Sequence, residues 1–286
     1  MKILSFGEII WDVYPDKSHI GGAPLNFAAH AAKQGAESYL VSAIGDDDLG
    51  KAALSELDKF GINRDFVCVK KGKSTGKCTV FLDFNGIPSF NLESESAYDE
   101  IDINDGLLSS SFDAVSFGTL AIRNEKSRHS LEKILKNGIA KAVYCDLNLR
   151  SPYYSPETVI FALHNCNILK ISDTELDYVR ETVLRSGATD YEHLLSELCT
   201  RCKNINLVLL TCGERGAYVY RSFNRKIYYR RALPVTVVST VGAGDSFGAV
   251  FLTEYLSGKS IDVCLDRAIC ISAQVVSREE AVPLDI

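Results

Sequence analysis

The sequence predicts an α/β fold in which helices cover both faces of a mainly parallel central sheet. Short, continuously apolar runs typical of buried strands alternate along the chain with amphipathic patterns typical of helices. Near the C-terminal end, a turn of small residues (STVGAGDSF, residues 239–247) joins a further apolar run to an apolar helix pattern. Both observations favour a parallel sheet, because parallel strands need crossover connections that are usually helical. Ligands of such folds bind beyond the carboxyl ends of the strands.

The individual elements follow from these patterns. We expect a strand within residues 1–10, with Asp12 at its end, and a helix that carries Asn26 and ends at Lys33. The stretch GDDDLGKA at residues 45–52 is close to a P-loop, but Ala52 replaces the required Ser or Thr, so we assign it to the start of a helix at 49–60. Further strands are expected at 115–120, 142–146, 167–171, 207–211 and 235–238, and further helices at 126–135, 174–184, 191–202 and 247–256.

One segment interrupts the alternation. Residues 79–84 and 87–92 flank the pair Asn85-Gly86, which is the strongest short signal for a type I′ β-hairpin. A hairpin inserted among strand–helix units is expected to lie outside the main sheet, and the alternative is an ordinary edge hairpin. The polar residues 91–105 are the candidate hinge between this hairpin and the body.

Composition limits the classes of function. The chain has 286 residues, 46% of them apolar, and a net charge of −6, which gives no electrostatic footprint for nucleic acid or an anionic membrane. No apolar run approaches the roughly 20 residues of a membrane span, so we expect a cytoplasmic protein. The nine cysteines are scattered as in a reduced protein, and the five histidines lack metal-ligand spacing.

The turn at residues 239–247 points to phosphate chemistry. A strand that turns through small residues into a helix presents free backbone N–H groups, here those of Ala243, Gly244 and Asp245, at the positive end of the helix dipole. The carboxylate of Asp245 is then placed to remove a proton from a hydroxyl while the amides stabilise the transferred group. Phosphoryl transfer to an alcohol is the leading hypothesis. The alternatives are a glycine turn with an Asp cap, or a dinucleotide fingerprint, which Phe247 disfavours because glycine is required there.

A second block, GGAPLNFAA at residues 21–29, suits a polyol. Gly21 and Gly22 allow the backbone to approach a ligand, and the amide of Asn26 can both donate to and accept from a hydroxyl. Asp12 can accept hydrogen bonds from two hydroxyls. Taken alone, residues such as Asp12 and Asn26 are more often caps or turn residues than ligands.

These blocks resemble the signatures of a known family. TVGAGDSF at 240–247 and GGAPLNFAA at 21–29 are similar to the C-terminal and N-terminal signatures of the ribokinase-like (PfkB) carbohydrate kinases, in the same order. Three further blocks also resemble family blocks: DLNLR at 146–150, KISDTE at 170–175 and TCGERG at 211–216. Their residues are most similar to those of the fructokinase branch. The resemblance covers nearly the whole chain. It implies a three-layer α/β/α fold, one catalytic domain over residues 1–286, and a small β-sheet lid, formed by segments near 11–22 and 76–98, that closes over the sugar.

The resemblance also implies roles for individual residues. Asp245 is the expected general base, and the anion hole is formed by Gly242, Ala243 and Gly244. Asp146, Asn148 and Arg150 alternate at the end of a strand, so we expect one face to present them to the cleft. Asn148 would orient substrate or phosphate, and Arg150 would neutralise phosphate charge unless it forms a surface ion pair. The remaining implied ligands are Asp12, Gly21, Gly22 and Asn26 for the sugar, and Lys170, Glu175, Thr211, Gly213 and Gly216 for the nucleotide. ATP and Mg²⁺ are the implied cofactors, with Glu175 helping to hold Mg²⁺ through water.

The chain departs from the family in several places. Ser239 stands where an Asp usually helps to bind K⁺, and a neutral hydroxyl is a poorer ligand, so K⁺ is doubtful as an activator. Glu280 replaces a usual glycine and Ile269 a frequent Asn near adenine, and Ile87 replaces the arginine that many fructokinases carry after the hairpin turn. We therefore expect an ATP-dependent sugar kinase with fructose as first choice. The alternatives are 2-keto-3-deoxygluconate, ribose or a nucleoside as substrate, or a non-catalytic sugar-binding regulator. The lid edge is a candidate homodimer surface.

Overall fold

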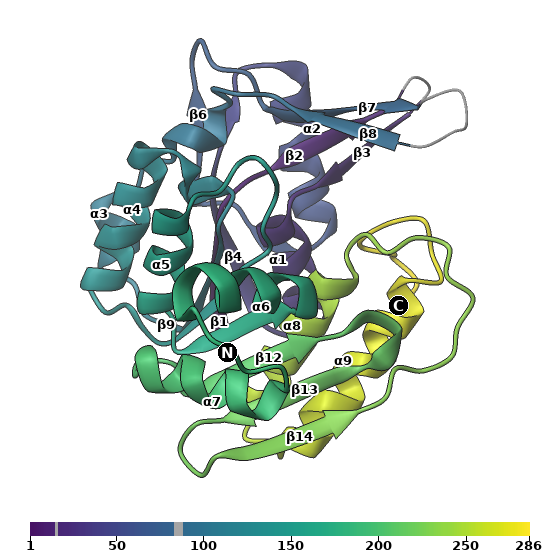
Figure 1. Cartoon of the computed structure of the whole chain (residues 1–286). Coiled ribbons are helices and arrows are strands. Elements are labelled where there is room, and N and C mark those ends of the chain that lie inside the picture. Colours follow the sequence, from purple (N-terminus) through teal and green to yellow (C-terminus); the bar gives the residue numbers. More distant parts are fainter. Residues whose placement is uncertain (15–16, 83–87) are drawn as a thin grey trace.

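The computed structural model describes residues 1–14, 17–82 and 88–286 (Figure 1). The strands are β1 (Lys2–Phe6), β2 (Ile10–Val13), β3 (Ser18–Gly21), β4 (Glu37–Gly45), β5 (Ile62–Asn63), β6 (Val67–Lys70), β7 (Gly76–Leu82), β8 (Pro88–Leu92), β9 (Phe112–Gly118), β10 (Ala140–Asp146), β11 (Ile168–Ser172), β12 (Leu207–Thr211), β13 (Ala217–Arg221) and β14 (Lys226–Arg230). The helices are α1 (Ala23–Lys33), α2 (Asp48–Lys59), α3 (Asp105–Leu108), α4 (Glu125–Lys136), α5 (Pro156–His164), α6 (Asp173–Val179), α7 (Tyr191–Arg201), α8 (Ala243–Leu256) and α9 (Ile261–Val275). Single helical turns form η1 (Ala97–Glu100), η2 (Ala121–Arg123), η3 (Arg180–Leu184) and η4 (Gly213–Arg215).

The main sheet is parallel except at one edge. Its strands follow the order β14-β13-β12-β11-β10-β9-β1-β4-β5, and β6 pairs with β4 beyond β5. Every pair from β12 to β5 is parallel, whereas β13 and β14 form an antiparallel edge. The predicted mainly parallel sheet is therefore confirmed.

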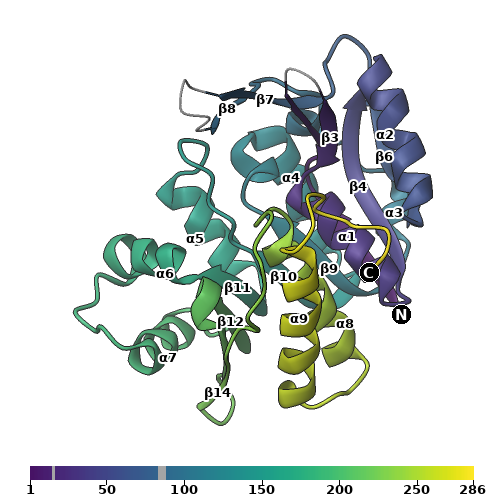
Figure 2. The same ribbon diagram turned by 90° about the vertical axis from the view of Figure 1, so that its right-hand side faces the viewer.

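Helices cover both faces of this sheet. Figure 2 shows α5, α6 and α7 on one side of it and α1, α8 and α9 on the other. Neighbouring strand residues accordingly enter different cores: Ile3 packs with α8 and α9, whereas Leu4 packs in the core that includes α4, α5 and α7. Because both faces are buried, the strands need apolar residues at successive positions, which explains their continuously apolar sequences.

A second, four-stranded sheet projects from the body (Figure 1). Its order is β3-β2-β7-β8, in which β2 is antiparallel to β3 and parallel to β7, and β7 is antiparallel to β8. The expected hairpin thus pairs and lies outside the main sheet, while its Asn85-Gly86 turn lies outside the described residues. Asp12 belongs to β2 of this small sheet and not to the end of the first strand, as the sequence had suggested.

The segment before the glycine turn differs from the prediction. Residues 235–238 form no strand, and Val235, Val237 and Val238 are 41%, 60% and 54% exposed. The Val238 N–H donates to the carbonyl of Val276, which follows α9, and not to a neighbouring strand. The apolar run was therefore misread as a strand. The helix that follows starts at Ala243, four residues earlier than expected, so the glycine turn forms its first turn.

Two other predicted helices match the structure to different degrees. The pattern at 174–184 is divided between α6 and the π-helical turn η3, whereas the pattern at 191–202 matches α7 within one residue. Over the part of the chain that the structure describes, no helix is both long and apolar enough to cross a membrane.

A buried arginine ties the end of β8 to the body. The Arg123 guanidinium lies between the rings of Tyr98 and Tyr153, 5.2 and 5.0 Å from their centroids. Its Nε and Nη2 donate to the two carboxylate oxygens of Asp99 at 2.8 and 2.9 Å, and Nη2 also donates to the carbonyl of Glu93 at 3.0 Å. Glu93 and Asp99 both lie in the predicted hinge segment, so Arg123 fixes where the small sheet joins the main one.

Replacing Arg123 with Ala is expected to lower the free energy of unfolding by about 3 kcal/mol, because Asp99 would remain buried without its partner. The side chains of Arg123 and Asp99 are only 12% and 4% exposed, so solvent cannot substitute for the lost contact. Urea denaturation measures the change. Lys51→Ala is the matched control, since Lys51 pairs with Asp48 at the surface, where the two side chains are 72% and 102% exposed, and its loss should cost less than about 1 kcal/mol. Equal effects of the two substitutions would contradict this account.

Candidate active site

The N-terminus of α8 is formed by the glycine turn. Gly242 caps the helix with φ of 79°, a left-handed conformation that favours glycine. A Cβ on Gly242 would also lie 2.5 Å from the carbonyl oxygen of Ala281. The Ala243 N–H donates to Thr240 O at 3.3 Å, while within the described residues the N–H groups of Gly244 and Asp245 have no backbone acceptor. These two amides and the helix dipole can bind an anion.

The two sequence blocks meet at Asp245. Asn26 Nδ2 on α1 donates to Asp245 Oδ2 on α8 at 2.8 Å. The helices pack side by side on one face of the main sheet (Figure 2). The carboxylate is therefore held at the anion-binding end of α8 by a residue of the GGAPLNFAA block. A proton acceptor and an anion site thus share one location.

The small sheet contributes Asp12. A Cβ on Gly21 of β3 would lie 3.6 Å from Asp12 Oδ2, so the absence of a side chain at Gly21 leaves that oxygen uncovered on this side. Burial raises the pKa of Asp12, against the opposing charges of Arg150 and His19. The Cys78 thiol on β7 is hydrogen-bonded to Asp12, and burial together with that carboxylate raises the pKa of Cys78 to about 11. No sequence pattern indicated a role for Cys78.

The DLNLR block has a different backbone from the one expected. β10 ends at Asp146, and Asn148 adopts φ of 40°, so Asp146, Asn148 and Arg150 do not share one face of a strand. The alternation argument for these residues was wrong because it assumed an extended backbone. Arg150 is nevertheless close enough to Asp12 to oppose the rise of its pKa. It therefore lies on the side of the site that carries Asp12.

A buried ion pair lies beneath the start of α8. Lys170 Nζ contacts both carboxylate oxygens of Asp146, at 2.9 and 2.8 Å. A Cβ on Gly244 would lie 2.9 Å from that Nζ, so the helix N-terminus sits directly above the ammonium. Burial opposes the charge of Lys170, but Asp146 and Glu175 outweigh it and raise its pKa. Burial raises the pKa of Asp146 to about 6, against the pull of Lys170. Lys170 therefore adds positive charge below the anion site.

Glu175 anchors two segments at once. Its Oε2 accepts from Ser172 N at 2.7 Å in the capping box of α6, and its Oε1 accepts from Leu149 N at 2.7 Å. Within residues 1–14, 17–82 and 88–286, the structure contains no cluster of three or more His, Cys, Asp or Glu that could hold a metal ion.

The TCGERG block forms the tight turn that was expected after β12. Thr211 is the last residue of the strand, and η4 follows at once. Gly213 and Gly216 have φ of 55° and 102°, and Cys212 N donates to Gly216 O at 2.8 Å to close the loop. Thr211 and Lys170 lie on the parallel neighbouring strands β12 and β11. This loop therefore lies at the same carboxyl-terminal end of the sheet as the ion pair.

One buried carboxylate was missed. Glu8 follows β1, is completely buried, and has the charges of Asp245 and Arg150 in its surroundings. Its Oε2 is buried without a hydrogen-bond partner among the described residues. The signal was present in the sequence, since Glu8 is the one acidic residue within the otherwise apolar stretch 3–11, apart from polar Ser5 and Gly7.

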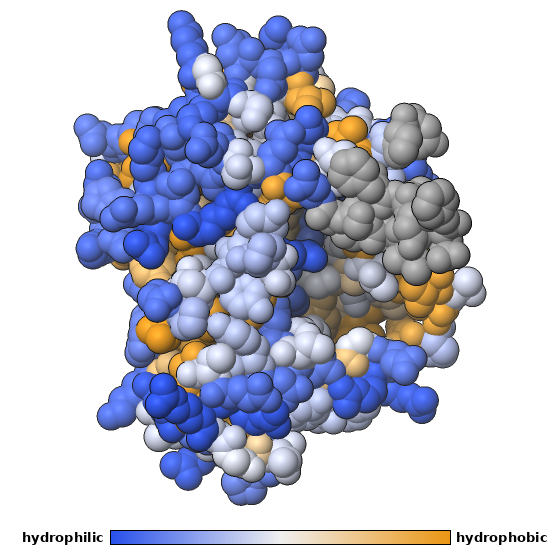
Figure 3. Space-filling view, turned by 45° about the horizontal axis from the view of Figure 1, so that its top comes forward, coloured by the Kyte–Doolittle hydropathy of each residue, from blue (hydrophilic) through white to orange (hydrophobic). Residues whose placement is uncertain are grey.

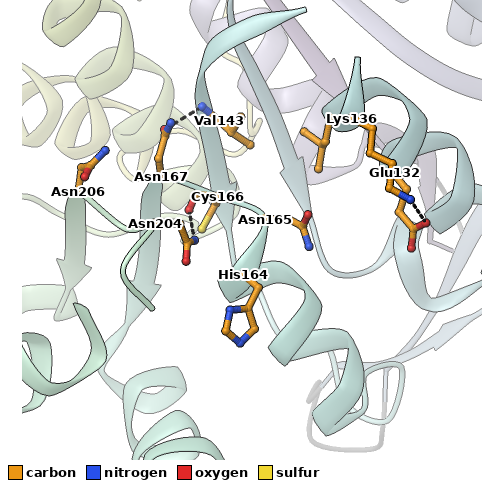
Figure 4. A pocket seen from close by; sticks show the side chains of 10 residues that line it. Glu132, Lys136, Val143, His164, Asn165, Cys166, Asn167, Asn204 and Asn206 are labelled. Carbon is orange, nitrogen blue, oxygen red and sulfur yellow. Dashed lines mark hydrogen bonds and ion pairs between the residues drawn. The ribbon is translucent and has the colours of Figure 1, made fainter. Parts of the chain in front are cut away.

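A separate pocket of about 370 Å³ lies at the amino-terminal end of the sheet strands (Figure 4). Its lining includes Asn167, which directly precedes β11, and Asn204, which lies three residues before β12. Their amides already bond the backbone: Asn167 Oδ1 accepts from Val143 N at 2.9 Å, and Asn204 Nδ2 donates to Cys166 O at 2.6 Å. These asparagines close loops, and the pocket is remote from Asp245 because it lies at the amino ends of the strands.

The exposed segment before α8 is apolar. Figure 3 shows apolar side chains gathered beside a hollow in the surface. Leu233, Val235, Val237, Val238 and Val241 are all exposed to more than a third. These exposed apolar residues lie directly before the open N-terminus of α8 and present an apolar surface beside it.

Lys170→Met is expected to destabilise the protein by about 3–5 kcal/mol at pH 8, because Asp146 would be a buried charge without a partner. Loss of the ammonium should raise the pKa of Asp146 further, so at pH 5 the carboxyl takes up a proton and the loss becomes smaller. Urea denaturation at both pH values measures this. Lys59→Met, which removes a surface pair with Glu56, is the control. A loss for Lys170→Met that does not depend on pH would contradict the pairing.

Comparisons with known proteins identify the family. The family model described as pfkB family carbohydrate kinase matches residues 3–285. The fructokinase of Solanum tuberosum is 29% identical over 278 residues, which cover 91% of this chain and 82% of the potato protein. The solved structure of an uncharacterized sugar kinase from Pyrococcus horikoshii matches with a TM-score of 0.82 at 24% identity, over 99% of this chain and 94% of that one. The ribokinase of Arabidopsis thaliana, solved with ribose and ATP, matches with a TM-score of 0.79 at 24% identity, over 99% and 94%. These matches confirm the ribokinase-like fold, and the chain belongs to the pfkB family of carbohydrate kinases.

Proposed function

We propose that this sugar kinase transfers the γ-phosphoryl group of ATP to a hydroxyl of D-fructose, with Asp245 as the general base. The observation that carries the proposal is the hydrogen bond of 2.8 Å between Asn26 Nδ2 and Asp245 Oδ2. It joins the block suited to a polyol to a carboxylate at the anion-binding end of α8.

The residues at the carboxyl ends of the parallel strands and at the start of α8 suit a nucleoside triphosphate. The N–H groups of Gly242, Gly244 and Asp245 point to an anion hole, and Lys170 lies below them with its charge retained. Lys170, Glu175, Thr211, Gly213 and Gly216 would form the nucleotide side. Mg²⁺, when bound, supplies charge neutralisation on the phosphates, and Glu175 would hold it through water. The carboxylate that usually binds K⁺ is replaced by Ser239, whose Oγ accepts from Val241 N at 3.2 Å.

The chain's own groups then suffice for the proton transfer. Asp12, Gly21, Gly22 and Asn26 hold the sugar, and Asn148 and Arg150 orient it and the phosphate. Asp245 accepts the proton of the attacking hydroxyl, and the amide donors of residues 242–245 stabilise the charge on the transferred group. Ala243 can join them once its N–H leaves Thr240 O. The small sheet acts as a lid that excludes water, which would otherwise compete as acceptor.

Charge in the sugar site favours a neutral sugar. Asp12 and Asp245 carry carboxylates, and Glu8 lies close to Asp245. Arg150 is the basic side chain whose charge acts on both Glu8 and Asp12, whereas His19 acts on Asp12 alone. A sugar acid such as 2-keto-3-deoxygluconate would meet this negative field. Several relatives are named fructokinases, which supports fructose as the neutral sugar.

The domain arrangement and assembly belong to the same proposal. Residues 1–286 form one catalytic domain with lid segments near 11–22 and 76–98. The unpaired edges of a small sheet invite pairing with a second copy, so a homodimer through the lid is the proposed assembly.

An ADP-release assay with Mg-ATP and a panel of D-fructose, ribose, a nucleoside and 2-keto-3-deoxygluconate tests the substrate. We expect the largest kcat/KM with D-fructose and the smallest with the sugar acid, because of the charge in the site. Preference for another neutral sugar would keep the mechanism and correct the substrate. Sugar binding in calorimetry without turnover of any sugar would instead indicate a non-catalytic regulator.

Asp245→Asn is expected to lower kcat by about 10²–10⁴-fold, because the amide cannot accept the proton. Asn can still hydrogen-bond Asn26, so calorimetric affinity for the sugar should change little. Asp58→Asn, which alters an exposed pair with Arg64, is the control and should retain activity. Near-normal turnover of Asp245→Asn would refute the assignment of the base.

A further inference from the structure

Glu8 is packed against the start of α1. It follows Gly7, whose φ of 151° directs the chain from β1 toward β2. A Cβ on Gly22 would lie 2.5 Å from the carbonyl oxygen of Glu8 and 3.4 Å from its Cγ. The side chain therefore lies directly beneath the turn that begins the helix, and Gly22 must be glycine for this approach.

The carboxyl group of Glu8 lies at the start of α1, where no side chain caps the helix. The N-cap position is Gly22, which has no side chain to accept from the free N–H groups. The backbone N–H of Ala23 is close enough to the Glu8 carboxyl to lower its pKa, against the larger effect of burial. One turn later, Asn26 N donates to Gly22 O at 2.9 Å, and Asn26 Nδ2 donates to Asp245. Glu8 thus supports the turn from which Asn26 reaches the proposed base.

The other oxygen of this carboxyl group is unused. Glu8 Oε2 is buried and has no partner among the described residues, and the same holds for Asn26 Oδ1. Unpartnered buried oxygens are rare in folded proteins, because desolvating them costs free energy that no contact returns. Retaining a carboxylate here therefore calls for a role beyond packing beneath the turn.

Glu8 changes charge near neutral pH. Burial raises its pKa from the usual 4.5 to about 7, Asp245 adds to the rise, and Arg150 and the backbone donors oppose it. The ionisable groups that face it are Asp245 from α8, Arg150 from the loop after β10, and Tyr98 from η1, whose own pKa is raised by burial. Arginine and the buried tyrosine keep their protonation states between pH 6 and 8, so Glu8 can titrate there against a constant background from these two.

We propose that Glu8 is a positioning residue for proton transfer at Asp245: it holds the turn that carries Asn26, and its ionisation places a second negative charge beside the base. This inference rests on the proposed function. When Glu8 is ionised, transfer of the hydroxyl proton to Asp245 removes one of two neighbouring negative charges, and this relief of repulsion favours the transfer. We therefore expect kcat to rise as Glu8 loses its proton.

The test is the pH profile of kcat between pH 5.5 and 9 for the wild type, Glu8→Gln and Glu8→Ala, with Mg-ATP and D-fructose. For the wild type we expect a rise of roughly three- to tenfold through an apparent pKa near 7. Glu8→Gln keeps the size and shape of the side chain beneath Gly22, so it should keep the wild-type KM for fructose while its kcat stays at the low-pH level of the wild type throughout. Glu8→Ala removes that packing as well and should raise KM.

The control is His19→Gln, because His19 is another side chain near Asp12 and imidazole ordinarily titrates near neutral pH. This variant should keep the rise in kcat. The proposal is overturned if Glu8→Gln keeps the same rise near pH 7, or if Glu8→Ala binds fructose as well as the wild type does.

A second readout needs no turnover. A carboxyl whose pKa is raised in the folded state stabilises the fold below its unfolded value of 4.5 and loses that contribution as the pH rises to about 7. The melting temperature of unliganded Glu8→Gln should therefore rise relative to that of the wild type between these pH values. Above them, the difference between the two melting temperatures should stay constant. A difference that does not depend on pH would overturn the buried-carboxyl account. Absence of turnover in every variant, with this pH dependence present, would overturn the proposed function and the catalytic role that rests on it.

Discussion

The hydrogen bond between Asn26 and Asp245 is the interaction on which the site depends. It joins helices that begin 220 residues apart along the chain, Ala23 on α1 and Ala243 on α8, and that pack on one face of the main sheet. Each helix begins at a glycine with positive φ, Gly22 or Gly242, and neither glycine has a side chain to cap it. Both N-termini are thereby open to groups from elsewhere: the Glu8 carboxyl at α1 and an anion at α8.

Lys170 keeps a positive charge below the site although its burial opposes that charge. Lys170 keeps its proton because Asp146 and Glu175 surround it, and it lies beneath Gly244, where a phosphate would otherwise face only backbone amides. Glu175 also ties the loop after β10 to the start of α6. The same carboxylates thus support the local fold and set the field at the sheet edge. A site assembled from several strand ends in this way can be altered in specificity by its loops while the sheet remains unchanged.

The sequence predicted the parallel sheet, the hairpin and the helices well, because buried strands and amphipathic helices carry their periodicity locally. It failed where the answer depends on distant contacts. Val237 looks buried by composition but is exposed, since no strand pairs beside it. Asn148 was assumed to continue a strand, yet its φ of 40° redirects the chain. Arg123 and Glu8 could not be placed from periodicity, because the surroundings of each side chain include a partner that is distant in the sequence.

The most direct test of the central claim is a crystal structure with D-fructose and a non-hydrolysable ATP analogue. The account predicts the terminal phosphate within hydrogen-bond distance of the amides at residues 242–245, and a sugar hydroxyl between that phosphate and the Asp245 carboxylate. A terminal phosphate bound away from the start of α8, or a sugar whose hydroxyls do not reach Asp245, would contradict it.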